Sequence, residues 1–145
     1  MDALSSLVLR GSEEGLRAAR TGLDAFVEAH GLVREDVWPF QVALDEMLSN
    51  VVRHGGPGAS GPARVEVRLR LDGDALEMVV EDDAPAFNPF QAAPPDTKSP
   101  LEKRAPGGLG IALVRQLMDV MEYTRAGDRN RLLLRRRVTR GVEPA

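Results

Sequence analysis

The sequence contains no cysteine, only two histidines, and a single tryptophan and tyrosine in 145 residues. Without cysteine, disulfides, zinc–thiolate sites and cysteine nucleophiles are excluded. With only His30 and His54, a histidine-rich transition-metal site is a poor interpretation. No apolar run approaches the length of a membrane span, and the first residues lack the basic and apolar regions of a signal peptide. We therefore expect a cytoplasmic protein without membrane contact.

The overall charge gives no reason to expect a nucleic-acid partner, because the formal net charge is −3. Hydrophobic residues make up 43% and charged residues 28% of the chain, as in a globular protein of one domain. Arginines are concentrated between Arg125 and Arg140, where they partly alternate with apolar residues. This pattern favours the solvent-facing side of a strand, with a docking surface as the alternative.

The first elements are a short strand and two helices. The apolar run in residues 5–10 predicts a strand at a sheet edge. Ser12 is expected to cap a helix that ends before Gly31, and Asp36 to cap a second helix with Pro39 in its first turn. The apolar stripe expected on the first helix consists of Leu16, Ala19, Leu23, Phe26 and Val27.

The second helix carries two different stripes over residues 40–54. Glu46, Asn50 and Arg53 are three and four residues apart, so they share one face. A carboxylate beside a carboxamide suits Mg²⁺, which prefers oxygen ligands and often sits between one or two protein groups and substrate phosphates. The alternative is an ordinary amphipathic helix with a polar side. The core-facing stripe consists of Phe40, Leu44, Met47, Leu48 and Val51.

Two hairpins and one further helix complete the chain. Alternating apolar residues predict strands over 64–71 and 76–82, joined by a turn at Gly73, and over 121–125 and 131–138, joined around Gly127. Residues 55–63 are too rich in glycine and proline to be regular. The segment 84–107 is interpreted as either a functional lid or a disordered connection that does not build the core. Gly107, Gly108 and Gly110 lead into a helix, where free backbone amides favour an anion, and its core stripe is predicted to be Ile111, Leu113, Val114 and Leu117.

The order strand, two helices, hairpin, lid, helix, hairpin predicts the fold class. We expect an α+β protein with a two-layer α/β sandwich, in which helices cover one face of a mainly antiparallel sheet. No internal repeat is visible, and residues 1–145 are interpreted as one domain.

Taken together, these motifs resemble the ATP-binding (Bergerat) fold of the GHKL superfamily. Within it, the chain is most similar to the small bacterial anti-sigma factor serine kinases of the RsbW and SpoIIAB type. The family's N box, E-x-x-x-N, is matched by Glu46 and Asn50. The resemblance implies that Asn50 holds Mg²⁺ against the ATP phosphates and that Glu46 acts as general base or orients the attacking hydroxyl. Arg53 and His54 follow on the same helix and are further candidates, with a purely structural role as the alternative for His54.

The family's two glycine boxes are matched only in part. The first, D-x-G-x-G, corresponds to Asp82 through Ala86, and the resemblance implies that Asp82 accepts a hydrogen bond from the adenine amino group. Both of its glycines are alanines here, Ala84 and Ala86. In the second box, G-x-G-x-G, the first glycine is Pro106, whereas Gly108, Leu109 and Gly110 match. Between the boxes lies the family's ATP lid, in which Lys103 and Arg104 are either phosphate contacts or solvated charges.

The resemblance implies an ATP- and Mg²⁺-dependent serine/threonine protein kinase that acts as an anti-sigma factor. Its implied partners are a STAS-type anti-sigma antagonist, which it phosphorylates, and a sigma factor. It also implies a homodimer through the edge strand near the amino terminus. The alternative function is a docking module whose nucleotide pocket is weak or lost, which the altered first glycine box favours. The presence of both Glu46 and Asn50 argues for catalysis, since a pure scaffold has no need of a base.

Overall fold

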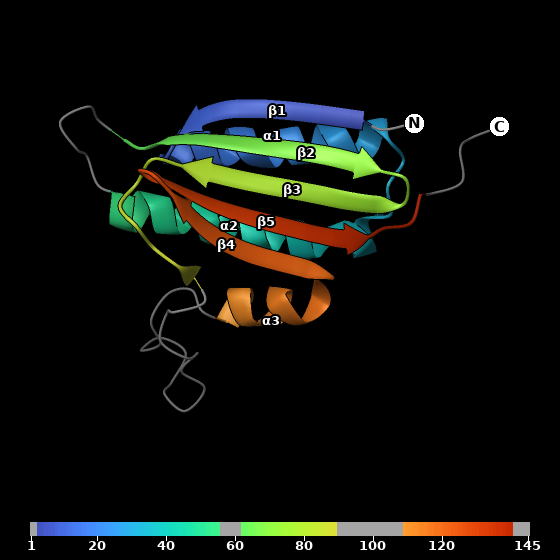
Figure 1. The fold of residues 1–145 in the computed structure, drawn as a ribbon. Coiled ribbons are helices and arrows are strands. Elements are labelled where there is room, and N and C mark those ends of the chain that lie inside the picture. The colour runs from blue at the N-terminus through green and yellow to red at the C-terminus, as the bar shows by residue number, and fades with distance from the viewer. Residues whose placement is uncertain (1–2, 56–61, 90–108, 141–145) are drawn as a thin grey trace, which may run out of the picture.

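The structure is a computed structural model that describes residues 3–55, 62–89 and 109–140. Five antiparallel strands form one sheet in the order β1-β2-β3-β5-β4. Figure 1 shows α1 and α2 covering one face of this sheet, and α3 packs against α2. The predicted α+β two-layer sandwich is confirmed. The elements are β1 (Ala3–Arg10), α1 (Glu13–Ala29), α2 (Arg34–Gly55), β2 (Arg64–Asp72), β3 (Ala75–Asp82), α3 (Leu109–Leu117), β4 (Val120–Ala126) and β5 (Arg129–Arg137).

The beginning of α1 follows the sequence prediction. The hydroxyl oxygen of Ser12 accepts a hydrogen bond from the backbone N–H of Gly15 at 3.1 Å, so Ser12 is the N-cap. A Cβ on Gly15 would lie 1.9 Å from the carbonyl oxygen of Arg10, so only glycine fits where α1 crosses the end of β1. Gly31, with φ of +59°, ends the helix as expected.

The start of α2 corrects one prediction. The helix begins at Arg34, so Asp36 lies in its first turn and is not its cap. The Asp36 carboxylate instead accepts a hydrogen bond from the backbone N–H of Thr139 at 2.8 Å, and its carbonyl accepts one from Arg136. Arg136 lies near the end of β5 and Thr139 just after it, 100 and 103 residues away from Asp36 in the chain, so local sequence gave no sign of them. Pro39 therefore lies inside the helix, not in its first turn.

The core lies between the sheet and the helices. The predicted inward stripe of α2, from Phe40 to Val51, is buried throughout, and Phe40 and Leu44 are fully inaccessible. Alternate residues of β2, β3 and β5 meet this stripe from the sheet. In α3, Ile111 and Val114 are buried, whereas Leu113 is 45% exposed, contrary to the prediction that it belongs to the core. The buried stripe fixes which side of α2 faces away from the core.

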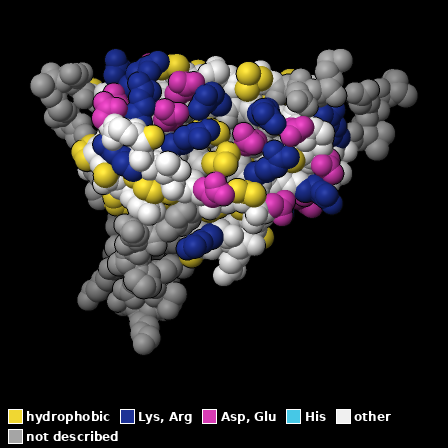
Figure 2. Space-filling view, in the orientation of Figure 1, with side chains coloured by type: hydrophobic (Ala, Val, Ile, Leu, Met, Phe, Trp, Pro, Cys, Tyr) yellow, Lys and Arg dark blue, Asp and Glu magenta, His cyan; other side chains and the backbone are white. Residues whose placement is uncertain are grey.

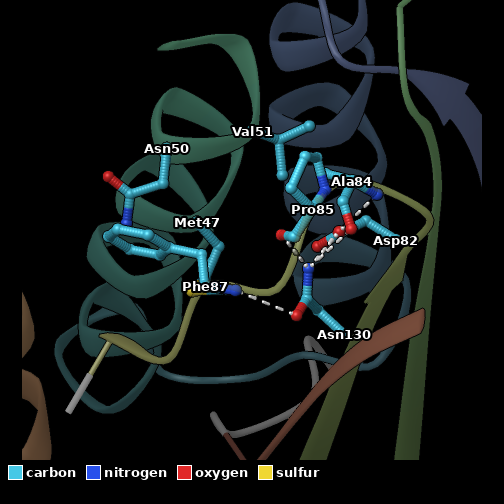
Figure 3. Close-up of a pocket in the computed structure, with 8 residues that line it drawn as sticks. All are labelled: Met47, Asn50, Val51, Asp82, Ala84, Pro85, Phe87 and Asn130. Carbon is cyan, nitrogen blue, oxygen red and sulfur yellow. Dashed lines mark hydrogen bonds between the residues drawn. The ribbon is translucent and has the colours of Figure 1, made fainter. Parts of the chain in front are cut away.

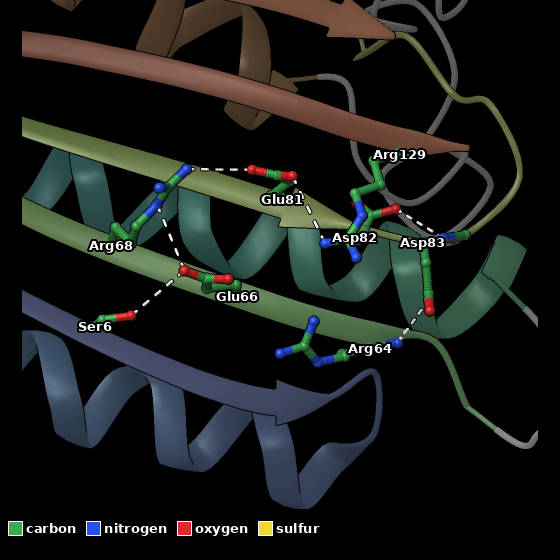
Figure 4. A network of polar contacts seen from close by, with 9 residues as sticks. Ser6, Arg64, Glu66, Arg68, Glu81, Asp82, Asp83 and Arg129 are labelled. Carbon is green, nitrogen blue, oxygen red and sulfur yellow. Dashed lines mark hydrogen bonds and ion pairs between the residues drawn. The ribbon is translucent and has the colours of Figure 1, made fainter. Parts of the chain in front are cut away.

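The other face of the sheet is open and carries intermixed charges (Figure 2). A ladder of polar contacts crosses it from Ser6 through Glu66, Arg68 and Glu81 to Arg129 (Figure 4). The Arg68–Glu81 pair is separated by 3.2 Å and the Arg129–Glu81 pair by 3.7 Å. Arginines here are matched by acids of neighbouring strands, which favours the solvent-facing interpretation of the arginine-rich segment.

Within the described ranges, no helix is both long and apolar enough to cross a membrane.

Candidate nucleotide-binding site

A pocket opens where the second half of α2 meets the end of β3 and the start of β5 (Figure 3). It holds about 250 Å³ of space, part of which is continuous with solvent. Because this space includes open solvent, the enclosed part is smaller than the roughly 300–1,000 Å³ of typical ligand pockets. The lining residues are Met47, Asn50, Val51, Asp82, Ala84, Pro85, Phe87 and Asn130.

On the α2 side, the predicted polar stripe forms as expected. The Asn50 carboxamide lines the pocket, and its oxygen accepts a hydrogen bond from Nη2 of Arg53 at 2.7 Å. Glu46 lies one turn earlier on the same helix, but it does not line this pocket. The structure therefore brings Glu46, Asn50 and Arg53 to one side of α2 and places only Asn50 against the cavity.

Glu46 is covered by the start of α3. A Cβ on Gly110 would lie 3.0 Å from both Cγ and Oε1 of Glu46, so glycine allows this close approach. The Oε2 atom is buried and has no hydrogen-bond partner among the described residues. Burial raises the pKa of the Glu46 carboxyl, the charge of Arg53 opposes this change, and Asp45 adds to it. Such a carboxylate is poorly solvated, and a basic carboxylate is what proton abstraction requires.

Asp82 is the buried acid of the pocket, with 2% of its surface exposed. Its Oδ1 atom accepts hydrogen bonds from Nδ2 of Asn130 at 2.9 Å and from the backbone N–H of Ala84 at 3.0 Å. Burial raises its pKa, the hydrogen bonds from Asn130 and Ala84 lower it, Asp83 raises it and Arg125 lowers it. Neither hydrogen bond uses Oδ2, so within the described part of the chain this oxygen is available to a ligand that donates a hydrogen bond.

The structure distinguishes Asp82 from its neighbour. Asp83 is exposed, and its Oδ1 accepts a hydrogen bond from the backbone N–H of Arg64 at 2.7 Å (Figure 4). It therefore points out of the pocket, and it ties β2 to the end of β3. Ala84 lines the pocket, whereas Ala86 is exposed and does not.

The two alanines of the first glycine box do not strain the backbone. None of the described residues other than glycine has a positive φ, so Ala84 and Ala86 adopt backbone conformations open to any residue. The change from glycine therefore adds methyl groups without distorting the turn. Ala84 contributes one such methyl to the wall of the pocket.

The sequence analysis missed Asn130, which is 3% exposed and contacts both Asp82 and the segment after β3. A signal was present, because Asn130 shares the core-facing side of β5 with Leu132 and Leu134, and a polar residue on a buried face needs partners. Tyr123 is half-buried and donates its hydroxyl hydrogen to Asn130. Phe87 was also missed as a lining residue.

Several predicted site residues lie outside the described part of the chain. These are Gly108 of the second glycine box and the lid residues Lys103 and Arg104. The backbone at His54 and Leu109 is helical, but their side chains are not described. The lid is described only up to residue 89 and the loop 55–63 only at its ends.

The donor set fits a magnesium ion shared with phosphates. The described residues contain no group of three or more acidic, histidine or cysteine side chains that could hold a metal by themselves. Mg²⁺ is commonly bound by one or two protein oxygens while waters and substrate phosphates complete its shell. Asn50 offers such an oxygen at the pocket wall, provided that Arg53 releases it, and the orphaned Oε2 of Glu46 lies one turn away.

Comparisons with known proteins give a consistent result. Residues 9–136 match the family described as histidine kinase-like ATPase domain. The serine/threonine-protein kinase BtrW of Bordetella bronchiseptica is 32% identical over 123 residues, which cover 80% of this chain and 85% of that protein. The serine-protein kinase RsbW of Bacillus pumilus is 32% identical over 108 residues, covering 71% of this chain and 67% of that protein.

A solved structure shows the same fold. The crystal structure of the RsbU and RsbW domains of a Mycobacterium tuberculosis protein superimposes with a TM-score of 0.68 and 17% sequence identity, covering 95% of this chain. Because only 32% of that longer chain is covered, this chain corresponds to about a third of it. At this identity the likeness concerns the fold alone.

Proposed function

Because this chain belongs to the family of histidine kinase-like ATPase domains, we propose that it is an ATP-dependent serine/threonine protein kinase. The observation that carries the proposal is the pocket with Asp82 at one wall and Asn50 at the other, with Glu46 one helical turn from Asn50. Phosphoryl transfer from ATP needs three kinds of group. These are an oxygen that accepts a hydrogen bond from the adenine ring, an oxygen that binds the metal ion, and a carboxylate that can take up a proton. The similar proteins named serine/threonine-protein kinase and serine-protein kinase support this assignment.

Each group has one task in the proposed mechanism. Asp82 accepts a hydrogen bond from the exocyclic amine of adenine through Oδ2. Asn50 holds Mg²⁺, which when bound neutralises phosphate charge and aligns the terminal phosphate. The Glu46 carboxylate accepts the proton of the attacking serine or threonine hydroxyl. Phosphoryl transfer depends mainly on position and charge, and the first-turn amides of α3, which a helix leaves without intrahelical partners, are expected to favour the phosphates.

The protein substrate and binding partner follow from the RsbW-type relatives. We propose that the chain phosphorylates a STAS-type anti-sigma antagonist and binds a sigma factor in a partner-switching system of the cytoplasm. A modified antagonist would no longer compete for the kinase, and the sigma factor would stay captured. This assignment rests on the resemblance and the similar sequences.

Nucleotide binding provides the direct test of the site. Calorimetry with ATP is expected to show binding that strengthens with Mg²⁺ in the wild type. In Asn50→Ala the Mg²⁺ dependence should be lost, because no protein oxygen remains for the ion at that wall. Gln41→Ala, which removes a carboxamide from the same helix away from the pocket, serves as control. Transfer of labelled phosphate to a STAS-domain protein then tests the reaction.

The alternative is a docking module without catalysis, and two observations favour it. The first glycine box contains Ala84 and Ala86, and the pocket is small as it stands. The unstrained backbone at the alanines and the presence of Glu46 favour the kinase. Absence of ATP binding at millimolar concentration would support the docking module, as would binding without transfer to any STAS protein.

We also propose a homodimer through β1. This strand lies at the edge of the sheet, where unpaired backbone groups favour strand addition. Leu4 and Val8 on it are 71% and 51% exposed. Val8→Lys is expected to shift the protein to the monomer in sedimentation, since a charge would have to be buried. Leu113→Lys, a change at a similarly exposed apolar residue of α3, should leave the dimer intact, and equal behaviour of the two variants would contradict the proposed interface.

A further inference from the structure

Asn130 has more hydrogen-bond partners than any other described side chain of the pocket. It stands near the start of β5, paired with Asp82 in the sheet register, and its side chain points into the wall of the pocket (Figure 3). Its Nδ2 atom lies 2.9 Å from Oδ1 of Asp82 and 3.2 Å and 3.0 Å from the carbonyl oxygens of Ala84 and Pro85. All three of these partners are acceptors.

The oxygen at the other end of the same carboxamide is an acceptor. This Oδ1 accepts hydrogen bonds from the backbone N–H of Phe87 at 3.2 Å and from the hydroxyl of Tyr123. Reversing the carboxamide would still let the Tyr123 hydroxyl accept a hydrogen bond, but it would set the NH₂ group against the N–H of Phe87 and the oxygen against three acceptors. Only one orientation of Asn130 therefore satisfies its surroundings.

These contacts replace backbone hydrogen bonds in the segment after β3. Two successive carbonyls, of Ala84 and Pro85, and the N–H of Phe87 converge on one side chain. Pro85 has no N–H of its own to offer the turn. Nη1 of Arg125 donates a further hydrogen bond to the Ala84 carbonyl at 2.9 Å. The shape of the pocket wall thus depends on side chains from β4 and β5.

The same carboxamide determines which oxygen of Asp82 meets the ligand. Asn130 and the N–H of Ala84 both bind Oδ1, so the carboxylate cannot rotate without breaking two hydrogen bonds. Oδ2 remains as the acceptor for a ligand. Asn130 itself has no donor left over, because its two N–H groups already serve three acceptors.

We propose that Asn130 is a positioning residue of the nucleotide pocket. Its carboxamide holds the alanine–proline segment and the Asp82 carboxylate so that a single oxygen, Oδ2, reads the amino group of the base. This role rests on the proposed function. It acts through Asp82 and not by contact with the base.

The pH dependence of ATP affinity distinguishes a positioning role of Asn130 from a merely structural one. A hydrogen bond from Asn130 lowers the pKa of Asp82 against the effect of burial, while Asp83 raises it and Arg125 lowers it. Without Asn130, Asp82 ionises only at higher pH. Since the base needs the ionised acceptor, the binding deficit of an Asn130 variant should be largest at low pH and shrink as pH rises. A general loosening of the fold would weaken binding at every pH.

The experiment compares ATP affinity by calorimetry from acidic to alkaline pH in the wild type, Asn130→Leu and Tyr123→Phe. Asn130→Leu is expected to bind about tenfold more weakly or worse near neutral pH, from the loss of a hydrogen bond to a charged group. Tyr123→Phe, which removes one donor to Asn130 and keeps the carboxamide, should show a smaller deficit of the same pH dependence. Leu132→Met, a volume-conserving change on the same face of β5, is the control, with wild-type pH dependence expected.

The thermal unfolding of each variant is measured as well. If Asn130→Leu does not fold, the pH dependence of ATP affinity in Tyr123→Phe tests the proposal. Wild-type affinity in the Asn130 and Tyr123 variants, or a deficit that is constant with pH, would overturn the role of Asn130 while leaving the kinase proposal in place. If the wild type itself binds no ATP, the proposed function fails and this role fails with it.

Discussion

Glu46→Gln is expected to slow phosphoryl transfer by about 10²–10⁴-fold, the usual contribution of a general base, while ATP binding stays close to that of the wild type. Glu46 does not line the pocket that contains Asp82 and Asn50, so it makes no contact with the base end of the ligand. Its proposed task arises only when a hydroxyl is ready to lose a proton. Transfer of labelled phosphate measured beside calorimetric affinity separates the two effects.

The pH profile gives a second signature of the same group. Burial raises the pKa of Glu46, and the base is active only when ionised. The wild-type rate should therefore increase with pH through this raised pKa and then level off. In Glu46→Gln that increase should be missing, because the group that titrates is gone.

Stability provides a check that loss of activity is not unfolding. A carboxyl whose pKa is higher in the folded than in the unfolded protein stabilises the fold below its unfolded pKa and loses that contribution as pH rises through the folded one. At neutral pH, ionised Glu46 thus opposes folding, and its Oε2 has no hydrogen-bond partner among the residues that the structure describes. Glu46→Gln should unfold at the wild-type temperature or above.

Asp45→Asn is the matched control for Glu46. Asp45 is the adjacent acid on α2, and it forms an ion pair with Arg20 of α1 at 2.8 Å. Removing this partly exposed pair should cost at most about 1 kcal/mol of stability and leave transfer near wild type. Wild-type transfer rates in Glu46→Gln would exclude Glu46 as the base.

Asp82→Asn is expected to weaken ATP binding by about 10- to 100-fold, the range for a lost hydrogen bond to a charged group. Asparagine can keep Oδ1 toward Asn130 and the N–H of Ala84, whose hydrogen bonds orient the native carboxylate. Its NH₂ group then takes the place of Oδ2. A donor would face the donor of the adenine amine, so the affinity for ATP drops.

Inosine triphosphate distinguishes this explanation from a collapsed pocket. Its base carries a carbonyl in place of the amine, which suits the new NH₂ group, so its affinity should fall less than that of ATP or rise. Calorimetry with both nucleotides provides the ratio. Asp83→Asn is the control, since Asp83 is exposed and its recorded partner is the backbone of Arg64. An unchanged ATP to inosine triphosphate ratio in Asp82→Asn would show that Asp82 does not read the base.

The local elements of this protein were determined by the sequence alone. Helical and alternating apolar patterns predicted the helices and the strands, and Ser12 predicted the start of α1. Gly73 and Gly127 predicted the two hairpin turns, where both have a positive φ. These features are local because a helix face or a strand face repeats within a few residues. The polar stripe of Glu46, Asn50 and Arg53 was predicted for the same reason.

Only the tertiary structure decided which distant residues meet. The pairing of β3 with β5 sets Asn130 opposite Asp82, 48 residues apart in the chain, and the packing of α3 on α2 partly buries Glu46 beneath Gly110. Asp36 likewise found its partner at Thr139 and not at the helix end. Periodicity reports which face of an element is apolar, but it carries no information on the register of distant strands. The side chains that orient the pocket are therefore joined by sheet pairing and helix packing, which the complete fold alone establishes.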